Sequence, residues 1–331
     1  MKITKGRYAS GVLLLLLIFL GLIYWALVSG STAIQLTDIK ELLQGRISPS
    51  LQVIITLRLP RIVIALLAGI ALAISTVLLQ IVTKNPLAEA GLLGIASGAE
   101  FGYLLVVLFF PTAFQYAPIV AIVMAMFTCL FLLQISSHRQ MMMAYFLIAG
   151  IAIQAMFSSL TKLLSQVYRP TNGLAVTPTL GMKNWEDVLQ MTWPILLLVL
   201  AVIVMIRWCE RLQLDDQTLR SLGVHVSLWQ GYFLLIAVAL AAITTAYIGV
   251  VAFLGLLATH LAKRLVGNQP QRVLPIAALV GASLLIMADT IGRTWFLPAE
   301  IAANQLLALI GAPVLLYLVA RKDGIIWKSK N

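Results

Sequence analysis

The chain has 331 residues and a formal net charge of +11, and 61% of its residues are hydrophobic while only 11% are charged. A soluble domain carries about 25% charged residues, and a mean hydropathy of +0.99 means more apolar surface than a soluble core could bury. The apolar runs are long and continuous, unlike the short alternating strands of an outer-membrane barrel. The composition therefore predicts an all-α polytopic membrane protein, because lipid requires each segment to satisfy its own backbone hydrogen bonds.

A membrane span needs roughly 20 apolar residues, and the sequence predicts about ten transmembrane helices in one domain covering residues 1–331. The predicted spans are 11–29, 60–81, 92–110, 118–135, 142–165, 191–208, 229–249, 251–265, 273–292 and 304–320. Pro194 is expected near the start of the sixth span, where proline is tolerated. No small-residue cleavage site follows the first span, so we expect it to be retained rather than removed as a signal peptide.

Lysines and arginines gather on one side of this arrangement. They precede the first span, follow the sixth, and end the chain after the tenth. Cytoplasmic loops carry such an excess, so both termini are expected in the cytoplasm. The net charge is thus a topology signal, since it is spread over short loops rather than gathered on one face that could bind nucleic acid.

The longer connections carry helix signals of their own. In the outer loop 30–58, Thr37 or Asp38 can cap a short helix. In the outer loop 166–190, the polar residues 185–187 suggest a short interfacial helix.

The largest cytoplasmic element is 209–228, which is amphipathic and too polar to insert. Asp215 is expected to cap a helix whose apolar positions are Leu219 and Leu222, and Gly223 is expected to end it.

Small residues recur every four positions in three spans: Ala65, Gly69 and Ala73; Gly94, Gly98 and Gly102; and Ala237, Ala241, Thr245 and Gly249. Such stripes let helix backbones approach closely in lipid. Two interpretations stay open, a statically packed bundle and a smooth surface on which helices slide in a transporter.

Few charges lie within the spans. Glu100 falls in the middle of the third span, where a carboxylate is costly and is a functional hypothesis by default. A structural hydrogen bond, or a protonated acid facing a water-filled cavity, would explain it equally well. Asp289 and Arg293 are four residues apart near the outer end of the ninth span and are expected to pair across one turn.

The sequence lacks the residue patterns of an enzyme. It contains no G-x-x-x-x-G-K-[ST] phosphate loop, no H-E-x-x-H and no G-x-S-x-G, and its three histidines and two cysteines are scattered. We therefore expect a conduit with no cofactor or metal of its own.

One set of motifs runs through nearly the whole chain. It comprises 57–61, 68–71, 83–89, 91–98 with Gly102, Ala149 with Gly150, 220–224, 252–256, 260–262, Ala288 and Asp289 with Arg293, 298–300, and 311–313. In this order the motifs resemble the permease subunits of ATP-binding-cassette (ABC) importers for iron–siderophores, haem and cobalamin, the type II, FecCD-like importers.

The resemblance implies a ten-helix permease fold with an inverted repeat, in which helices two to five match helices seven to ten. It also implies a bacterial plasma membrane and a second permease copy or paralogue. Two cytoplasmic ATPases would hydrolyse the ATP, and a substrate-binding protein would deliver the ligand from outside.

The resemblance further implies roles for particular residues. Arg58, Arg61 and Arg293 match the outer arginines that dock the binding protein. The segment that couples to the ATPases includes Leu214, Asp215, Asp216, Leu219, Arg220, Leu222 and Gly223. Asn85, Leu87, Met143 and Ala144 match the cytoplasmic gate. Glu100 departs from the small or apolar residue that is usual in the family, and it is a candidate for the substrate pathway.

Three alternatives remain at this stage. Haem and a ferric siderophore are equally good substrates, and cobalamin is an alternative within the same family. A secondary transporter that couples to protons through Glu100 or Asp289 is a different class, but the cytoplasmic segment 209–228 argues against it because an ion-coupled carrier needs no site for an ATPase.

Overall fold

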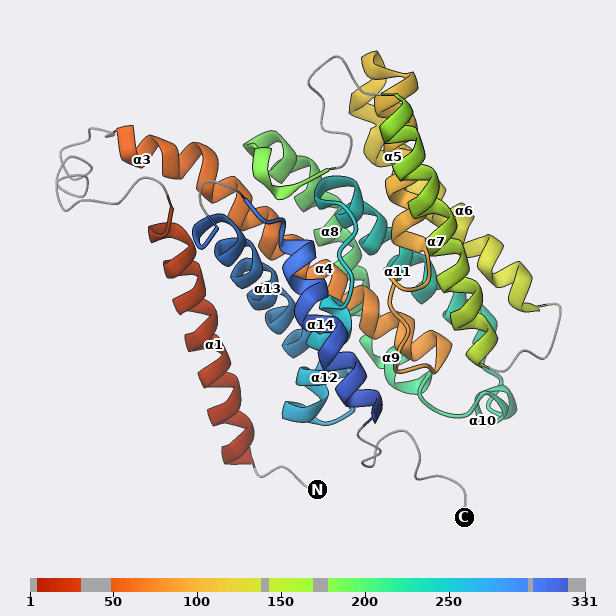
Figure 1. The fold of residues 1–331 in the computed structure, drawn as a ribbon. Coiled ribbons are helices and arrows are strands. Elements are labelled where there is room, and N and C mark those ends of the chain that lie inside the picture. Colours follow the sequence, from red (N-terminus) through yellow and green to blue (C-terminus); the bar gives the residue numbers. More distant parts are fainter. Residues whose placement is uncertain (1–4, 31–48, 138–142, 169–177, 297–299, 321–331) are drawn as a thin grey trace.

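The protein is a bundle of helices (Figure 1). The structure, a computed structural model, describes residues 5–30, 49–137, 143–168, 178–296 and 300–320. Its long helices are α1 (Lys5–Val28), α4 (Leu59–Thr83), α5 (Ile95–Phe109), α6 (Ala117–Ser137), α7 (Met143–Val167), α8 (Trp185–Val204), α11 (Val226–Ile248), α12 (Leu254–Val266), α13 (Pro270–Thr294) and α14 (Ala303–Ala320). Each predicted span overlaps one of them, and the sixth, 191–208, also runs past the end of α8 into α9 (Ile206–Arg211). The helix predicted at Thr37 or Asp38 lies outside the described residues.

The helices differ in how fully they could cross a membrane. Within the described chain, seven helical segments are long and apolar enough: Ser10–Val28, Leu51–Thr83, Pro111–Ile135, Ile148–Val167, Trp185–Val204, Val226–Ile248 and Pro270–Thr294. The apolar helix α5 is shorter, with 15 residues, and α12 has only 13. Most of α12 is buried, which suits a short helix because an end within the bilayer needs protein to satisfy its backbone.

Helix α4 lies at the centre of the bundle, and most of its side chains are buried. A methyl group added to Gly69 would lie 2.5 Å from the carbonyl oxygen of Gly281 on α13. On another side, the Ser75 hydroxyl donates a hydrogen bond of 2.7 Å to the carbonyl of Ala237 on α11. The stripe that contains Gly69 is therefore a helix-packing surface, as its spacing predicted, while a sliding role stays a prediction.

The glycines of α5 serve the same purpose toward α6 and α7. A methyl group on Gly98 would meet the Thr128 side chain, and one on Gly102 would meet Met124, both on α6. Gly94 has a φ of 77° and lies against Ile153 of α7. Only glycine fits there easily, because the backbone is left-handed as well as closely approached.

Two outer connections differ from the prediction. Residues 185–187 do not form a separate interfacial helix but the first turn of α8, because Asn184 and Asp187 exchange backbone and side-chain hydrogen bonds in a capping box. Pro194 therefore lies inside α8 rather than near its start. The end of the predicted loop 30–58 is also helical: α3 (Pro49–Val53) and the π-helical turn η1 (Ile54–Arg58) lead directly into α4.

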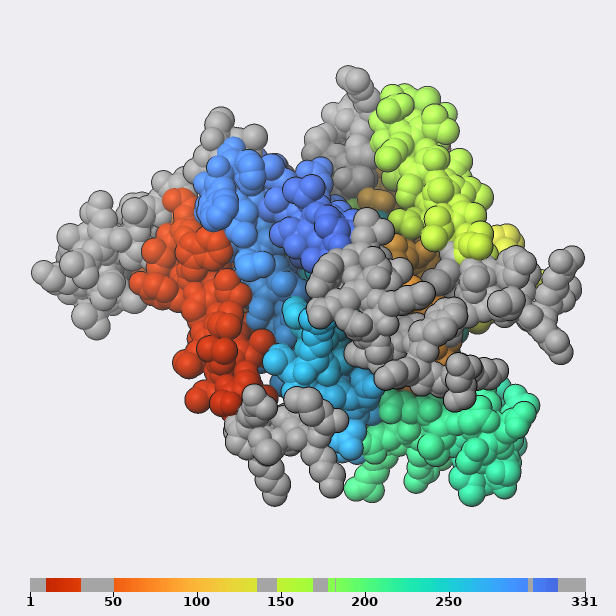
Figure 2. Space-filling view, turned by 60° about the horizontal axis from the view of Figure 1, so that its bottom comes forward, coloured from red at the N-terminus to blue at the C-terminus, as the bar shows by residue number. Residues whose placement is uncertain are grey.

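The two ends of the bundle carry different elements. The start of α1 and the end of α14 lie at the same end as α10 (Asp216–Ser221), and α3 lies at the other (Figure 1). When this first end is turned forward, α10 and the neighbouring α9 (Ile206–Arg211) form a lobe on it (Figure 2). We call it the coupling end, and the end with α3 the outer end.

Candidate functional site

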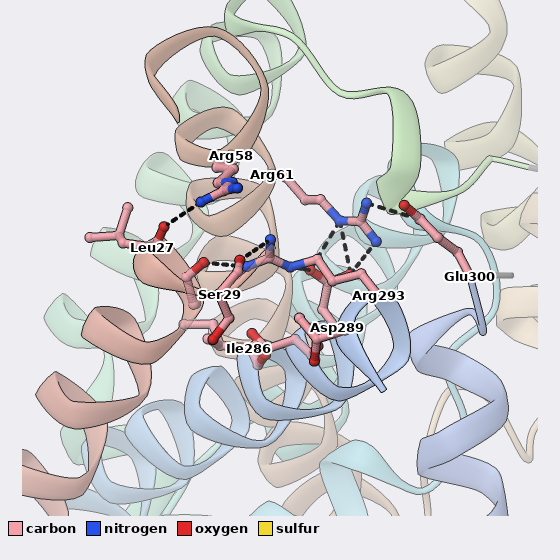
Figure 3. Close-up of polar contacts among 11 residues, drawn as sticks. Leu27, Ser29, Arg58, Arg61, Ile286, Asp289, Arg293 and Glu300 are labelled. Carbon is pink, nitrogen blue, oxygen red and sulfur yellow. Dashed lines mark hydrogen bonds and ion pairs between the residues drawn. The ribbon is translucent and has the colours of Figure 1, made fainter. Parts of the chain in front are cut away.

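An ion-pair network lies near the outer end of α4 and α13 (Figure 3). The Arg61 guanidinium donates to both carboxylate oxygens of Asp289, with distances of 2.8–3.0 Å, and to a Glu300 oxygen at 3.1 Å. The Asp289 side chain is only 4% exposed, whereas that of Glu300 is 54% exposed. Arg61 therefore has one buried partner, bonded through both carboxylate oxygens, and one partner that water can reach.

The other two outer arginines bind α1. Arg58 donates to the carbonyl of Leu27 at 2.9 Å, and Arg293 donates to the carbonyls of Ser29, at 2.9 Å, and Ala26 (Figure 3). The last carbonyls of a helix have no partner within the helix, and cations there also interact favourably with the helix dipole. Arg58 and Arg293 thus supply hydrogen-bond donors to the carbonyls at the end of α1 and attach this helix to the rest of the bundle.

The three arginines predicted to dock a binding protein are therefore close together, but each already has partners within the chain. Arg58 and Arg293 are buried, at 6% and 8% exposure. The predicted pair of Asp289 and Arg293 is present at 3.8 Å, yet the shorter partner of Asp289 is Arg61. The docking role of the three arginines stays a prediction, and among the contacts of the described residues Arg61 has an exposed carboxylate, that of Glu300, as a partner.

A cavity of about 160 Å³ opens beside this network. It is lined by Arg61, Asp289 and Glu300 together with residues from α11, the start of α14 and the turn η3 (Leu180–Met182). The carboxamide oxygen of Asn304, which also lines the cavity, is buried without a hydrogen-bond partner. The cavity therefore places polar groups from distant segments together at the outer end.

At the coupling end, the segment predicted to contact the ATPases folds as expected. The Asp215 carboxylate accepts a hydrogen bond from the backbone N–H of Gln217 and caps α10, and Gly223, with a φ of 75°, follows the helix end. Leu219 is buried, while Leu214 and Leu222 are 48% and 69% exposed. Of the remaining residues predicted for coupling, Asp215 and Arg220 are exposed and Asp216 is partly exposed.

The loop 84–94 holds the first two predicted gate residues. Asn85 is 2% exposed, and its side-chain oxygen accepts the backbone N–H of Leu87 at 2.9 Å. This bond is local and shapes the loop, while Leu87 remains partly exposed. Met143 and Ala144 begin α7, and their side chains lie outside the described part of the structure. The gate role of all four residues stays a prediction.

Glu100 lies on α5, which packs between α6 and α7. It is partly buried and close enough to Lys162 of α7 for an electrostatic attraction. This placement favours a role between helices over free exposure to lipid, and a pathway role stays a prediction.

Sequence reasoning missed Glu89, which is 3% exposed in the loop 84–94. Its two carboxylate oxygens accept the backbone N–H groups of Phe253 and Gly255, both at 2.9 Å. These groups belong to the start of α12, so Glu89 caps a helix 164 residues further along the chain. Burial raises the pKa of Glu89 to about 7, although the backbone donors act in the opposite direction. The available signal was the one acidic residue in the short stretch between two spans.

No group of three or more His, Cys, Asp or Glu side chains that could hold a metal ion occurs among the described residues. The polar groups of this part of the chain instead bind helix ends and one another. Their arrangement can join helices, present surfaces to partners and transmit movement, which suits a transport subunit.

Comparisons with known proteins agree with this geometry. The FecCD transport family matches residues 14–321. A Staphylococcus aureus (strain Newman) protein, "Probable heme-iron transport system permease protein IsdF", is 33% identical over 320 residues, which cover 96% of this chain and 98% of that one. The solved structure of a transporter ascribed to the metal-chelate ABC type, in an inward-facing conformation, has a TM-score of 0.78 and 27% identity and covers 95% and 99% of the two chains.

PsaBC from Streptococcus pneumoniae, solved in complex with Fab, shares the fold at a TM-score of 0.56 and 15% identity, covering 85% of this chain and 94% of that one. The all-helical permease fold predicted from the sequence is confirmed, while the inverted repeat stays a prediction. ATP hydrolysis belongs to a separate subunit, so this chain is not an enzyme. It belongs to the FecCD transport family and is a multi-pass membrane permease of an ABC transporter.

Proposed function

We propose that this permease imports an iron chelate, either haem or a ferric siderophore, across the plasma membrane of a bacterium. The name of the Staphylococcus aureus relative supports haem, and the structural neighbour, a transporter ascribed to the metal-chelate type, supports a metal chelate more generally. Cobalamin is the alternative within the same family. The conduit itself needs no cofactor, and ATP is consumed by the partner subunits.

The proposed mechanism rests on the fact that α10 has one buried side and one exposed side. Its buried Leu219 anchors the helix to the bundle, while Arg220 on the helix and the flanking residues Leu214 and Leu222 are exposed. A short helix with an exposed apolar and charged face suits recognition in a groove of a partner. We propose that each of two ATPases receives the coupling segment of one permease, and that the two permeases are copies of this chain or paralogues.

At the outer end, we propose that a substrate-binding protein docks over Arg61, with Arg58 and Arg293 supporting it. Arg61 combines a fixed position, given by Asp289, with an exposed second partner, Glu300. Charges of this kind give orientation and association rate more than affinity. This assignment requires the coupling end and both termini to be cytoplasmic, in agreement with the distribution of lysine and arginine.

The test is uptake by proteoliposomes that contain the permease, its ATPases and its binding protein. We expect radioactive iron supplied as haem or as a ferric siderophore to accumulate when ATP is present, and to do so after the proton gradient has been collapsed. Uptake that requires the gradient and not ATP would show a secondary transporter instead. Uptake of cobalamin without uptake of either iron compound would correct the substrate.

A further inference from the structure

Lys84 joins the coupling segment to the membrane helices. It directly follows α4, and its φ of 51° is left-handed, a conformation that residues other than glycine seldom adopt. Its ammonium group donates to the carbonyl of Leu214 at 3.0 Å and to the carboxylate of Asp216 at 2.7 Å. Both acceptors belong to the coupling segment, so the end of α4 is bonded directly to α10 and the residues before it.

A second contact joins the same region to α12. Gln80, one turn before Lys84, is 6% exposed. Its side-chain nitrogen donates to the carbonyl of Pro86 at 2.8 Å, and its side-chain oxygen accepts from Lys263 of α12 at 2.7 Å. A buried amide that is bonded at both its donor and its acceptor end is held in one orientation. The loop 84–94 and the last part of α12 are thus bonded to the same side chain of α4.

The same loop is attached to the first part of α12 as well. Glu89 accepts the N–H groups of Phe253 and Gly255, and Gly91 packs against the backbone of Val251 and Ala252. The side-chain oxygen of Asn85 accepts a hydrogen bond from the backbone N–H of Leu87, which stabilises the loop between these points. The loop is therefore bonded directly near the start of α12, a helix of 13 residues, and through Gln80 of α4 near its end, an arrangement that favours joint movement of loop and helix.

From these contacts we propose that Lys84 and Asp216 form the link through which a displacement of α10 moves the loop 84–94 and α12 as one body. Lys84 is a positioning residue in this scheme and contacts no substrate. The inference rests on the proposed attachment of an ATPase to the coupling segment and adds the path by which that attachment reaches the membrane helices.

The exposure of the pair makes the idea testable. The side chains of Lys84 and Asp216 are 36% and 40% exposed, and exposed ion pairs contribute little to folding stability. Removal of the Lys84 charge should leave a folded permease that still binds its ATPases, whereas Asp216 belongs to the coupling segment itself, so its variant is compared by uptake per ATP hydrolysed. If only the transmission of movement is lost, the complex should hydrolyse ATP without transporting its substrate.

The experiment measures ATP hydrolysis and iron-chelate uptake in proteoliposomes that hold the complete complex. Lys84→Met and Asp216→Asn are each expected to lower the uptake per ATP hydrolysed several-fold. The double variant should be no worse than either single one, because both changes remove the same link. Lys84→Arg should retain most of the coupling. The matched control is Arg264→Met, which removes an exposed positive charge from α12 and should leave the ratio unchanged.

Three results would overturn the inference: an unchanged ratio in Lys84→Met, single effects that multiply in the double variant, or ATPases that no longer bind to Lys84→Met. The last result would assign Lys84 to the docking surface itself. Failure of the proposed function is recognised separately, because the unaltered complex would then show no ATP-driven uptake.

Discussion

Arg61 and Asp289 are 228 residues apart in sequence, yet the Arg61 Nε and one terminal nitrogen bind the Asp289 carboxylate at 2.8–3.0 Å. The pair joins α4 to α13 near the outer end of the bundle. It also fixes Arg61, whose other partner among the described residues, Glu300, is exposed to water. Because the carboxylate of Asp289 is buried, removing either charge of the pair should destabilise the contact between α4 and α13.

Asp289→Asn should therefore destabilise the permease. Removing one partner of a buried ion pair costs about 3 kcal/mol or more, because the other charge stays buried without compensation. We expect a lower thermal midpoint in detergent, and a reduced ATP-driven uptake per folded permease only as far as docking of the binding protein over Arg61 is weakened. An unchanged thermal midpoint would contradict this structural role, and uptake that is lost although docking and the folded fraction are unchanged would revive proton coupling through Asp289.

Glu300→Gln should strengthen docking of the binding protein. Glu300 occupies one terminal nitrogen of Arg61, and an incoming carboxylate of the partner must compete with it. An exposed pair is worth up to about 1 kcal/mol, so the affinity should rise by up to about fivefold. The measurement is binding-protein affinity for the permease in nanodiscs.

The matched control is Glu186→Gln, which removes an exposed acidic charge from the first turn of α8. It should leave the affinity unchanged. Equal effects in the two variants would mean that overall charge, rather than competition for Arg61, controls docking. A weaker interaction in Glu300→Gln would make Glu300 itself a contact.

Arg293→Met should loosen α1. The carbonyls of Ala26 and Ser29 would lose a charged donor, and such hydrogen bonds contribute about 1.5–3 kcal/mol each. We expect faster hydrogen exchange along the last turns of α1, and Arg58→Met should act in the same direction through Leu27. Arg207→Met, an exposed position on α9, is the control. Unaltered exchange in α1 would show that its apolar contacts with α13 hold it without the arginines.

Glu89 should make the stability of the permease depend on pH. Its pKa is about 7 in the folded protein, above the ordinary value of 4.5, so the folded state keeps a proton that the unfolded state releases. Stability is then highest below the ordinary value and falls as the pH rises toward 7. The fall attributable to Glu89 is about 3 kcal/mol, since one pKa unit corresponds to about 1.4 kcal/mol.

Glu89→Gln resembles the protonated acid and should remove this part of the pH dependence. The measurement is the thermal midpoint of both proteins in detergent between pH 5 and pH 8, a range set by the two pKa values. The difference between the two proteins isolates Glu89 from other titrating groups. Parallel curves for the two proteins would contradict the assignment.

Gly281→Ala should separate α13 from α4. The added methyl group would clash with the carbonyl oxygen of Gly69, which is backbone and cannot rotate away. Overpacking of this kind costs about 1–3 kcal/mol. Gly231→Ala on α11 is the control, because nothing lies within 4 Å of the new methyl group and alanine favours a helix. Equal stability of the two variants would show that the helices can adjust at Gly281.

The sequence alone determined the bundle and the parts that depend on neighbours along the chain. Long apolar runs predict helices because lipid leaves the backbone no other way to satisfy its hydrogen bonds. Asp215 and Gly223 predicted the limits of α10 because both act within one or two turns. The glycine stripe on α5 likewise marked a contact surface, since helical spacing places its members on one face.

Only the tertiary structure decided which partner each buried polar group has. Asp289 was expected to pair with Arg293 across one turn, but its nearer partner is Arg61 from another helix. Arg58 and Glu89 likewise satisfy the ends of α1 and α12, which lie far away in sequence. Hydrophobicity and helical period are local properties that can be read from the chain. The partner of a buried charge depends instead on how the helices pack, and no local pattern of residues records that.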